Sequence, residues 1–358
     1  MKKEHNMNIH ASSRRFSAAP EVPTAVERRT GFDPPDFVAR FPWLGGDLQT
    51  LRNFIVRPRP DLSPWPERRI ELPLDDGSGD RLLAVLQDDP EADRPLVVLV
   101  HGLTGCQDSF YILGTARHLL AQGYPVLRLN LRGAGPGRPL ARRGYNAGSS
   151  ADLAGALQAL GARDGRLLAR GLALVGYSLG GNILLKFLAE RGRDFPVRAA
   201  ASVSAPIDLK ATQVRIMAPR NRLYHAYLLS RMKAELLATP GGVPAEVAER
   251  ARRARSVFAF DDAIVAPAAG FVGADDYYAR CAAQGFLTGI EAPALLLHAR
   301  DDPWIPAAAY EAADGLAKAN LQIRLLSGGG HVGFHGKGSR TAWHDRTIAA
   351  FLERQLSG

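Results

Sequence analysis

The sequence predicts an α/β fold: a mostly parallel sheet of eight strands flanked by helices. From about residue 68, short runs rich in Leu and β-branched residues alternate with amphipathic stretches, which is typical of helices covering a parallel sheet. The chain has 358 residues and 46% of them are apolar, enough for a large buried core. One interval, 207–291, is too long for a plain connection. Together these observations favour one three-layer domain with a helical insertion.

Predicted strands and helices alternate along the chain. The strands are mostly apolar, as expected where both faces are buried, and they cover 69–74, 81–87, 95–101, 125–131, 171–177, 197–204, 292–299 and 321–327. The helices have apolar positions at helical spacing, and they cover 109–121, 151–162, 179–191, 307–318 and 339–356. The long interval contains two further helical runs, at 221–237 and 244–256.

These elements divide the chain into three parts. Residues 1–31 are predicted to be a disordered basic tail, because they are rich in Ser, Ala and Pro and lack an apolar run of signal-peptide length. Residues 32–206 and 292–358 form the predicted core. Residues 207–291 are predicted to form a helical lid or cap over one end of the sheet.

Positive charge exceeds negative charge, with 45 Lys and Arg against 36 Asp and Glu, but it is spread along the chain. The stretch 124–150 is an exception, because it contains five arginines and no acidic residue. Arg132 and Arg138 in this stretch either attract substrates of negative charge or pair with carboxylates elsewhere in the fold. No zinc finger, RRM or helix-turn-helix pattern accompanies the charge, so we expect no specific nucleic-acid partner.

Membrane spanning and a disulfide scaffold are not expected. The longest charge-free run, 171–185, has 15 residues, whereas a membrane-spanning helix needs about 20 apolar ones. Weak peripheral contact with a membrane stays open. Cys106 and Cys281 are too few for a disulfide framework or a Cys-rich zinc site, and we expect both to be reduced. The expected location is therefore cytoplasmic; the oligomeric state is left open.

A Gly-x-Ser-x-Gly motif spans residues 176–180, with Ser178 at its centre. A predicted strand precedes it and a predicted helix follows, which is typical of the nucleophile turn of α/β-hydrolases. In that turn the serine hydroxyl lies exposed above the sheet, and the flanking glycines avoid clashes. The motif therefore predicts an α/β-hydrolase fold with Ser178 as nucleophile, rather than a plain helix N-cap serine.

A serine nucleophile needs a base and an acid, and in this fold both follow it in the order acid, histidine. After the strand at 292–299, Asp301 and Asp302 are candidates for the acid. We favour Asp302, because an aliphatic residue and a proline follow it at the usual spacing, but a slip of one residue would select Asp301. After the strand at 321–327, three glycines lead to His331, which we favour over His335 as the base.

Two backbone N–H groups are needed to stabilise the oxyanion. We assign one to Leu179, directly after the nucleophile, and the other to Leu103 in the HGLTG loop that follows the third strand. His101 at the start of that loop is expected to brace it. His344 lies in an amphipathic helical pattern and is expected at the surface. His331 and His335 lack the glutamate and third ligand of a metal site, so neither a metal nor a cofactor is expected.

An ordered series of motifs over 32–356 resembles the YheT-like α/β-fold hydrolases, which are related to the mammalian α/β-hydrolase-domain lipases. The motifs are FDPPDF, DLQT, VLVHGLTG, LNLRGAG, RRGYNAGSSADL, VGYSLGGNILLKFLAE, SVSAPIDL, YLLSRMK, FDDAIVAP, DDYYARC, HARDDPW and GGGHVGF. The resemblance implies a Ser, Asp, His carboxylester hydrolase for short- to medium-chain acyl esters or monoacylglycerol-like lipids. One departure is Asp47, where the family has a histidine before LQT.

The sequence thus predicts a serine carboxylester hydrolase whose partner is a small-molecule ester or lipid. Ser178 would attack the carbonyl, His331 would move the proton and Asp302 would stabilise the imidazolium. Three alternatives stay open, because a fold does not dictate a substrate: a thioesterase, another acyl hydrolase or transferase, and a binding protein without turnover.

Overall fold

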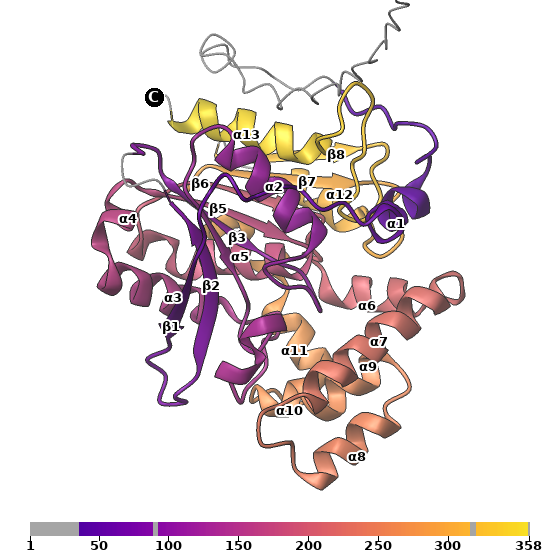
Figure 1. Ribbon diagram of the computed structural model, residues 1–358. Coiled ribbons are helices and arrows are strands. Elements are labelled where there is room, and N and C mark those ends of the chain that lie inside the picture. The colour runs from indigo at the N-terminus through magenta and orange to yellow at the C-terminus, as the bar shows by residue number, and fades with distance from the viewer. Residues whose placement is uncertain (1–35, 89–91, 316–319, 357–358) are drawn as a thin grey trace, which may run out of the picture.

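A computed structural model of the chain describes residues 36–88, 92–315 and 320–356. At its centre is an eight-stranded sheet with the strand order β1-β2-β4-β3-β5-β6-β7-β8 (Figure 1). The strands are β1 (Arg68–Pro73), β2 (Arg81–Gln87), β3 (Leu96–Val100), β4 (Val126–Leu129), β5 (Leu172–Tyr177), β6 (Val197–Val203), β7 (Ala294–Ala299) and β8 (Leu321–Leu326). The predicted fold class is confirmed.

Strand direction decides where the connecting loops meet. The β1–β2 and β2–β4 pairs are antiparallel, whereas every pairing from β4 through β3, β5, β6 and β7 to β8 is parallel. The carboxyl ends of parallel strands lie at one edge of a sheet. The loops after β3, β5, β7 and β8, which carry the predicted site residues, therefore share that edge.

Helices cover both faces of the sheet. On one face, α2 (Phe110–Leu120) and α13 (Trp343–Leu356) pack on alternate strand residues such as Val97 and Leu99. On the other face, α3 (Ser150–Arg163), α5 (Leu179–Arg191) and α12 (Ala308–Asp314) pack on the residues between them, such as Val98. Strand β3 is buried along its whole length, because it lies in the middle of this three-layer arrangement.

The segment between β6 and β7 is helical and lies to one side of the sheet (Figure 1). Its helices are α6 (Leu209–Met217), α7 (Arg222–Leu237), α8 (Ala245–Arg253), α9 (Val257–Phe260), a π-helical turn (Asp261–Val265), α10 (Ala266–Ala268) and α11 (Ala274–Cys281). A separate apolar cluster, including Leu229, Met232 and Phe260, holds several of them together. Its function as a lid or cap stays a prediction.

Several helices and one histidine differ from the sequence predictions. Helices α1 (Gly46–Val56) and α4 (Gly165–Ala169) have no counterpart among the predicted elements, and α6, α9, α10 and α11 lie outside the two helical runs predicted in the insertion. His344 was expected at the surface but is buried, because α13 lies against the sheet beside α2 and Tyr177 packs edge-on against the ring. The predicted disordered tail, 1–31, lies outside the described residues.

The contacts of Arg132 decide between the two readings of the basic stretch. Its side chain is 5% exposed, and its guanidinium donates hydrogen bonds to Asp76, Asp80 and Asp152 at 2.7, 3.0 and 2.6 Å. Arg138 donates instead to backbone carbonyls of its own loop. A guanidinium enclosed by three carboxylates offers no uncompensated charge to a substrate, so the reading in which Arg132 pairs with carboxylates is the correct one.

Candidate active site

Ser178 lies at the sharp turn between β5 and α5. Its backbone has φ 50° and ψ −124°, a conformation that L-residues other than glycine rarely adopt and that stores strain. The two glycines of the motif are required by close backbone contacts. A Cβ on Gly176 would lie 2.6 Å from the Gly180 carbonyl oxygen, and one on Gly180 would lie 2.3 Å from the His101 carbonyl oxygen. The sequence therefore builds a turn that only this glycine spacing permits.

The loops after β7 and β8 bring an imidazole and a carboxylate to this turn. His331 Nε2 lies 3.0 Å from Ser178 Oγ, and His331 Nδ1 lies 2.8 Å from Asp302 Oδ2. Asp302 is 1% exposed, and its other oxygen accepts the N–H groups of Trp304 and Ile305. Burial acts to raise the pKa of Asp302, but His331 and the hydrogen bonds outweigh it, so this pKa is lowered. The carboxyl group is thus ionised and oriented toward the histidine.

The alternative residues have other partners. Asp301 Oδ1 accepts the Gly330 N–H at 2.8 Å, so this carboxyl group braces the loop that leads to His331. The ring nitrogens of His335 have no hydrogen-bond partner in the described part of the chain, and burial lowers the pKa of this histidine to about 3. The structure therefore joins Asp302 and His331 to Ser178, and it leaves Asp301 and His335 outside this hydrogen-bonded chain.

The HGLTG loop packs against the nucleophile turn. A Cβ on Gly102 would lie 2.8 Å from Ser178 Cβ. The Gly102 N–H donates to Tyr111 Oη at 2.9 Å and the Thr104 N–H donates to Tyr145 Oη at 2.6 Å. The N–H of Leu103 between them donates no hydrogen bond within the described residues, and the same holds for Leu179. Both predicted oxyanion donors are thus unpaired.

His101 braces this loop, as predicted. Its Nε2 accepts the Leu131 N–H at 3.0 Å, and its Nδ1 lies 2.8 Å from the Gly102 carbonyl oxygen, to which it therefore donates. Burial lowers the pKa of His101 to about 4, so the ring is neutral and can serve both partners. Asn182 also has a structural function. Its side-chain NH₂ donates to the carbonyl oxygens of Ala147 and Cys281, and its side-chain oxygen accepts the Ala283 N–H.

Three contacts at the site were missed by sequence reasoning. The ring of Trp304 stacks on His331 at 4.3 Å between centroids. Thr50 Oγ1, on α1, accepts the His331 N–H at 2.8 Å. His298 Nδ1 lies 4.0 Å from Asp302 Oδ2, and burial lowers the pKa of this histidine to about 4. Trp304 lies within the predicted acid turn, which was a usable signal, whereas the DLQT motif contains Thr50 but gave no indication of a contact with His331.

Ser178 and His331 open into a cavity of about 740 Å³. Much of its wall is apolar and comes from the segment between β6 and β7, including Leu209, Ile216, Leu228, Met232, Leu236, Val257, Phe260, Ile264 and Val265. The volume is within the range of small-molecule sites. An apolar chain of several carbons attached to a carbonyl group would therefore fit beside the serine.

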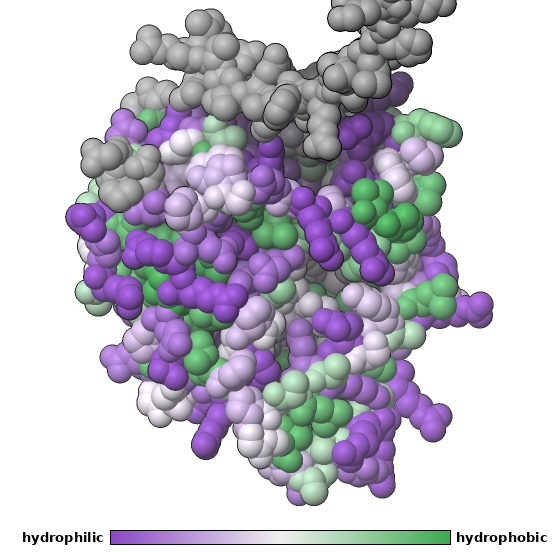
Figure 2. Space-filling view, in the orientation of Figure 1, coloured by the Kyte–Doolittle hydropathy of each residue, from purple (hydrophilic) through white to green (hydrophobic). Residues whose placement is uncertain are grey.

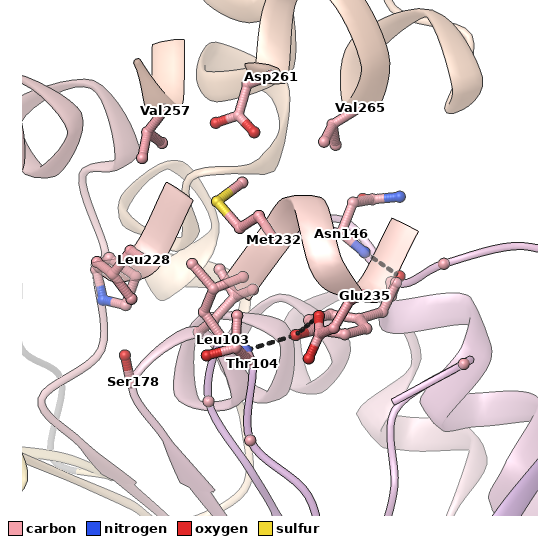
Figure 3. A pocket seen from close by; sticks show the side chains of 18 of the residues that line it. Leu103, Thr104, Asn146, Ser178, Leu228, Met232, Glu235, Val257, Asp261 and Val265 are labelled. Atoms are coloured by element: carbon pink, nitrogen blue, oxygen red, sulfur yellow. Dashed lines mark hydrogen bonds between the residues drawn. The ribbon is translucent and has the colours of Figure 1, made fainter. Parts of the chain in front are cut away.

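Two carboxyl groups interrupt this apolar wall: Figure 3 shows Asp261 between Val257 and Val265, and Glu235 beside Thr104. Burial raises the pKa of Glu235 to about 7, although a hydrogen bond from Tyr145 opposes the shift. Burial likewise raises the pKa of Asp261 to about 7, against a hydrogen bond from Tyr278. Each group is therefore partly protonated near neutral pH.

A family model described as alpha/beta hydrolase fold matches residues 95–337, more than half of the chain. The chain belongs to this family. "Putative esterase YheT" from Escherichia coli (strain K12) is 34% identical to this hydrolase over 295 residues, 81% of this chain and 84% of that protein. "Monoacylglycerol lipase" from Saccharomyces cerevisiae is 28% identical over 281 residues, 74% of this chain and 61% of that protein. The predicted resemblance to YheT-like, esterase- and lipase-type hydrolases is confirmed.

A solved structure of an esterase from Pyrococcus furiosus matches this hydrolase with a TM-score of 0.57 at 17% identity, covering 90% of this chain and 97% of that one. At that identity the match shows the fold alone. Within the described residues, no cluster of three or more His, Cys, Asp or Glu side chains could hold a metal ion. The described helices also include none with the length and apolar character needed to span a bilayer.

Proposed function

We propose that this hydrolase cleaves carboxylic esters through Ser178, His331 and Asp302. The observation that carries the proposal is the pair of contacts made by His331, 3.0 Å to Ser178 Oγ and 2.8 Å to Asp302 Oδ2. A histidine that bonds a serine with one nitrogen and a buried carboxylate with the other can act as a general base toward that serine.

The proposed reaction has two halves. His331 Nε2 removes the Ser178 proton as Oγ attacks the ester carbonyl, and the N–H groups of Leu103 and Leu179 stabilise the oxyanion. His331 then gives the proton to the leaving alcohol, which leaves an acyl-serine. Water attacks the acyl group with His331 again as base, and the carboxylic acid and free Ser178 result. Asp302 holds the imidazole in the required tautomer and stabilises its charged form.

The proposed substrates are short- to medium-chain acyl esters or monoacylglycerol-like lipids. The apolar wall contributed by the 207–291 segment, acting as the proposed cap, suits an acyl chain, and the name of the yeast relative points to the same class. Weak contact with a membrane surface stays a prediction. It is supported by exposed Leu48, Phe54 and Ile55 on α1, where Figure 2 shows apolar side chains at the surface.

The test combines one variant with a substrate panel. S178A should lose labelling by a fluorophosphonate probe, and kcat on an activated ester should fall by about 10⁴-fold or more, because the nucleophile is absent. Unchanged labelling of S178A would refute the assignment. A panel of acyl esters and acyl thioesters of graded length, run on both proteins, separates an esterase from a thioesterase.

A further inference from the structure

A chain of two hydrogen bonds links the helical insertion to the loop beside the nucleophile. The Thr104 N–H donates to Tyr145 Oη at 2.6 Å, and the Tyr145 hydroxyl lies 3.3 Å from Glu235 Oε2 on α7 (Figure 3). The direction of the first bond is fixed. Because a backbone N–H can only donate, Tyr145 Oη must accept from Thr104, and its own hydrogen is then available to Glu235.

The loop needs such support because its backbone is strained. Thr104 has φ 55°, in the left-handed region that a β-branched residue rarely occupies. Such a conformation persists only where surrounding contacts hold it. Because Thr104 directly follows Leu103, the contacts that hold Thr104 also orient the Leu103 peptide. On the other side, Tyr111 Oη accepts the Gly102 N–H. Two tyrosine hydroxyls thus fix the amides that flank Leu103, so that only the Leu103 N–H is left for another acceptor.

We propose that Tyr145 and Glu235 are positioning residues, which hold the Leu103 N–H in the orientation that stabilises the oxyanion. The inference rests on the proposed function. Glu235 accepts the Tyr145 hydrogen and thereby keeps the hydroxyl oxygen turned toward Thr104. Neither side chain touches the reacting atoms. Because Glu235 belongs to α7, a shift of this helix would change the catalytic rate as well as the shape of the cavity.

Glu235 is suited to this function by its surroundings. Its carboxyl group lines the cavity, and Arg138 and Arg231 lie near enough to act on its charge. It forms no ion pair in the part of the chain that the structure describes. Tyr145 is therefore its hydrogen-bond partner among those residues. A glutamine at this position would keep an acceptor oxygen, whereas a methionine of similar length would not.

The test separates catalytic positioning from plain stability. Y145F should lower kcat and kcat/KM together by about tenfold, with KM changed less than twofold, because a misplaced oxyanion donor acts on the transition state. Binding of a trifluoromethyl ketone, which forms a tetrahedral adduct with the serine, should weaken by a similar factor. E235M should lower kcat about threefold, and E235Q should keep at least half of it.

The matched control is Y124F, which removes another tyrosine hydroxyl bonded to a glutamate, Glu353 on α13, away from the site. It should unfold at lower urea concentration but keep its kcat.

In the Y145F background, E235M should cause no further loss of kcat. A kcat for Y145F within twofold of wild type, or an equal E235M effect in both backgrounds, would overturn the inference. If Y145F does not fold, the E235M and E235Q pair still decides it. A wild-type protein inert toward all esters would instead refute the proposed function.

Discussion

At the residue scale, the two neighbouring aspartates after β7 have different partners. Asp302 bonds His331 and two backbone N–H groups, whereas Asp301 bonds the backbone at Gly330. The difference follows from the turn: the Asp302 side chain points back over the Trp304 and Ile305 amides, so its second oxygen is directed at the imidazole. The two adjacent aspartates are therefore proposed to have different functions: Asp302 takes part in catalysis, and Asp301 stabilises the loop that leads to His331.

This difference predicts unequal effects of the same substitution. D302N should lower kcat by about 10³- to 10⁴-fold, because a neutral amide cannot stabilise the charged imidazole and its NH₂ group would face Nδ1, which favours the wrong tautomer of His331. D301N keeps an acceptor oxygen for the Gly330 N–H and should retain kcat within about threefold. Steady-state kinetics on one activated ester measure both. A larger loss for D301N than for D302N would transfer the acid function to Asp301.

At the element scale, α1 shows why part of the site could not be predicted. This helix buries Gln49 and Thr50, which bond the loop after β8, and exposes Phe54, Ile55 and Val56. A search for apolar residues on one helical face finds no such pattern, because the buried face is polar. The DLQT motif marks this segment, but no pattern in it predicts the support that α1 gives to His331.

The strands, in contrast, were predictable. Each buried strand is a short apolar run bounded by turn residues, and the order of these runs was enough to predict the sheet. Ser178, Asp302 and His331 could be predicted to lie together because each is in the turn or loop that follows such a strand, and these loops share one edge of the sheet. The links from α1 and α7 were not found, because they come from segments distant in the chain. Similarly, no local pattern indicates that Arg132 meets three carboxylates.

Arg132 connects three elements, and its loss should weaken the fold rather than the chemistry. Its side chain joins the loop after β4 to the β1–β2 hairpin, through Asp76 and Asp80, and to α3, through Asp152. R132M leaves the buried Asp80 carboxylate without this partner, so the free energy of unfolding should fall by about 3 kcal/mol.

Urea denaturation measures this change, and R143M is the control. Arg143 lies in the same loop, is 66% exposed and approaches Asp76 only at 3.8 Å. Its removal should change the free energy of unfolding by no more than about 0.5 kcal/mol. Equal destabilisation by both substitutions would mean that burial of the Arg132 network adds nothing to stability.

At the scale of the whole molecule, the two parts of the site come from different regions. The sheet edge supplies Ser178, His331 and Asp302 from loops after three strands, and the parallel pairing fixes their spacing. The segment between β6 and β7 supplies much of the apolar wall. Catalytic rate and chain-length preference should therefore respond to different substitutions, since the hydrogen bonds of Ser178, His331 and Asp302 described above involve no residue of the helical segment.

Met232 provides the test of this separation. It lies on α7, is 8% exposed and lines the cavity. In M232W the larger ring should occupy space that an acyl chain needs. We expect the ratio of kcat/KM for a twelve-carbon ester to that for a four-carbon ester to fall about tenfold, the effect of excluding roughly two methylene groups. Labelling by the fluorophosphonate probe reports that the serine remains reactive.

The control is A234W, which adds the same ring to an exposed position of the same helix and should leave the ratio unchanged. An unchanged ratio in M232W would mean that the acyl chain does not lie against α7, and the proposed cap would then have no part in selecting it.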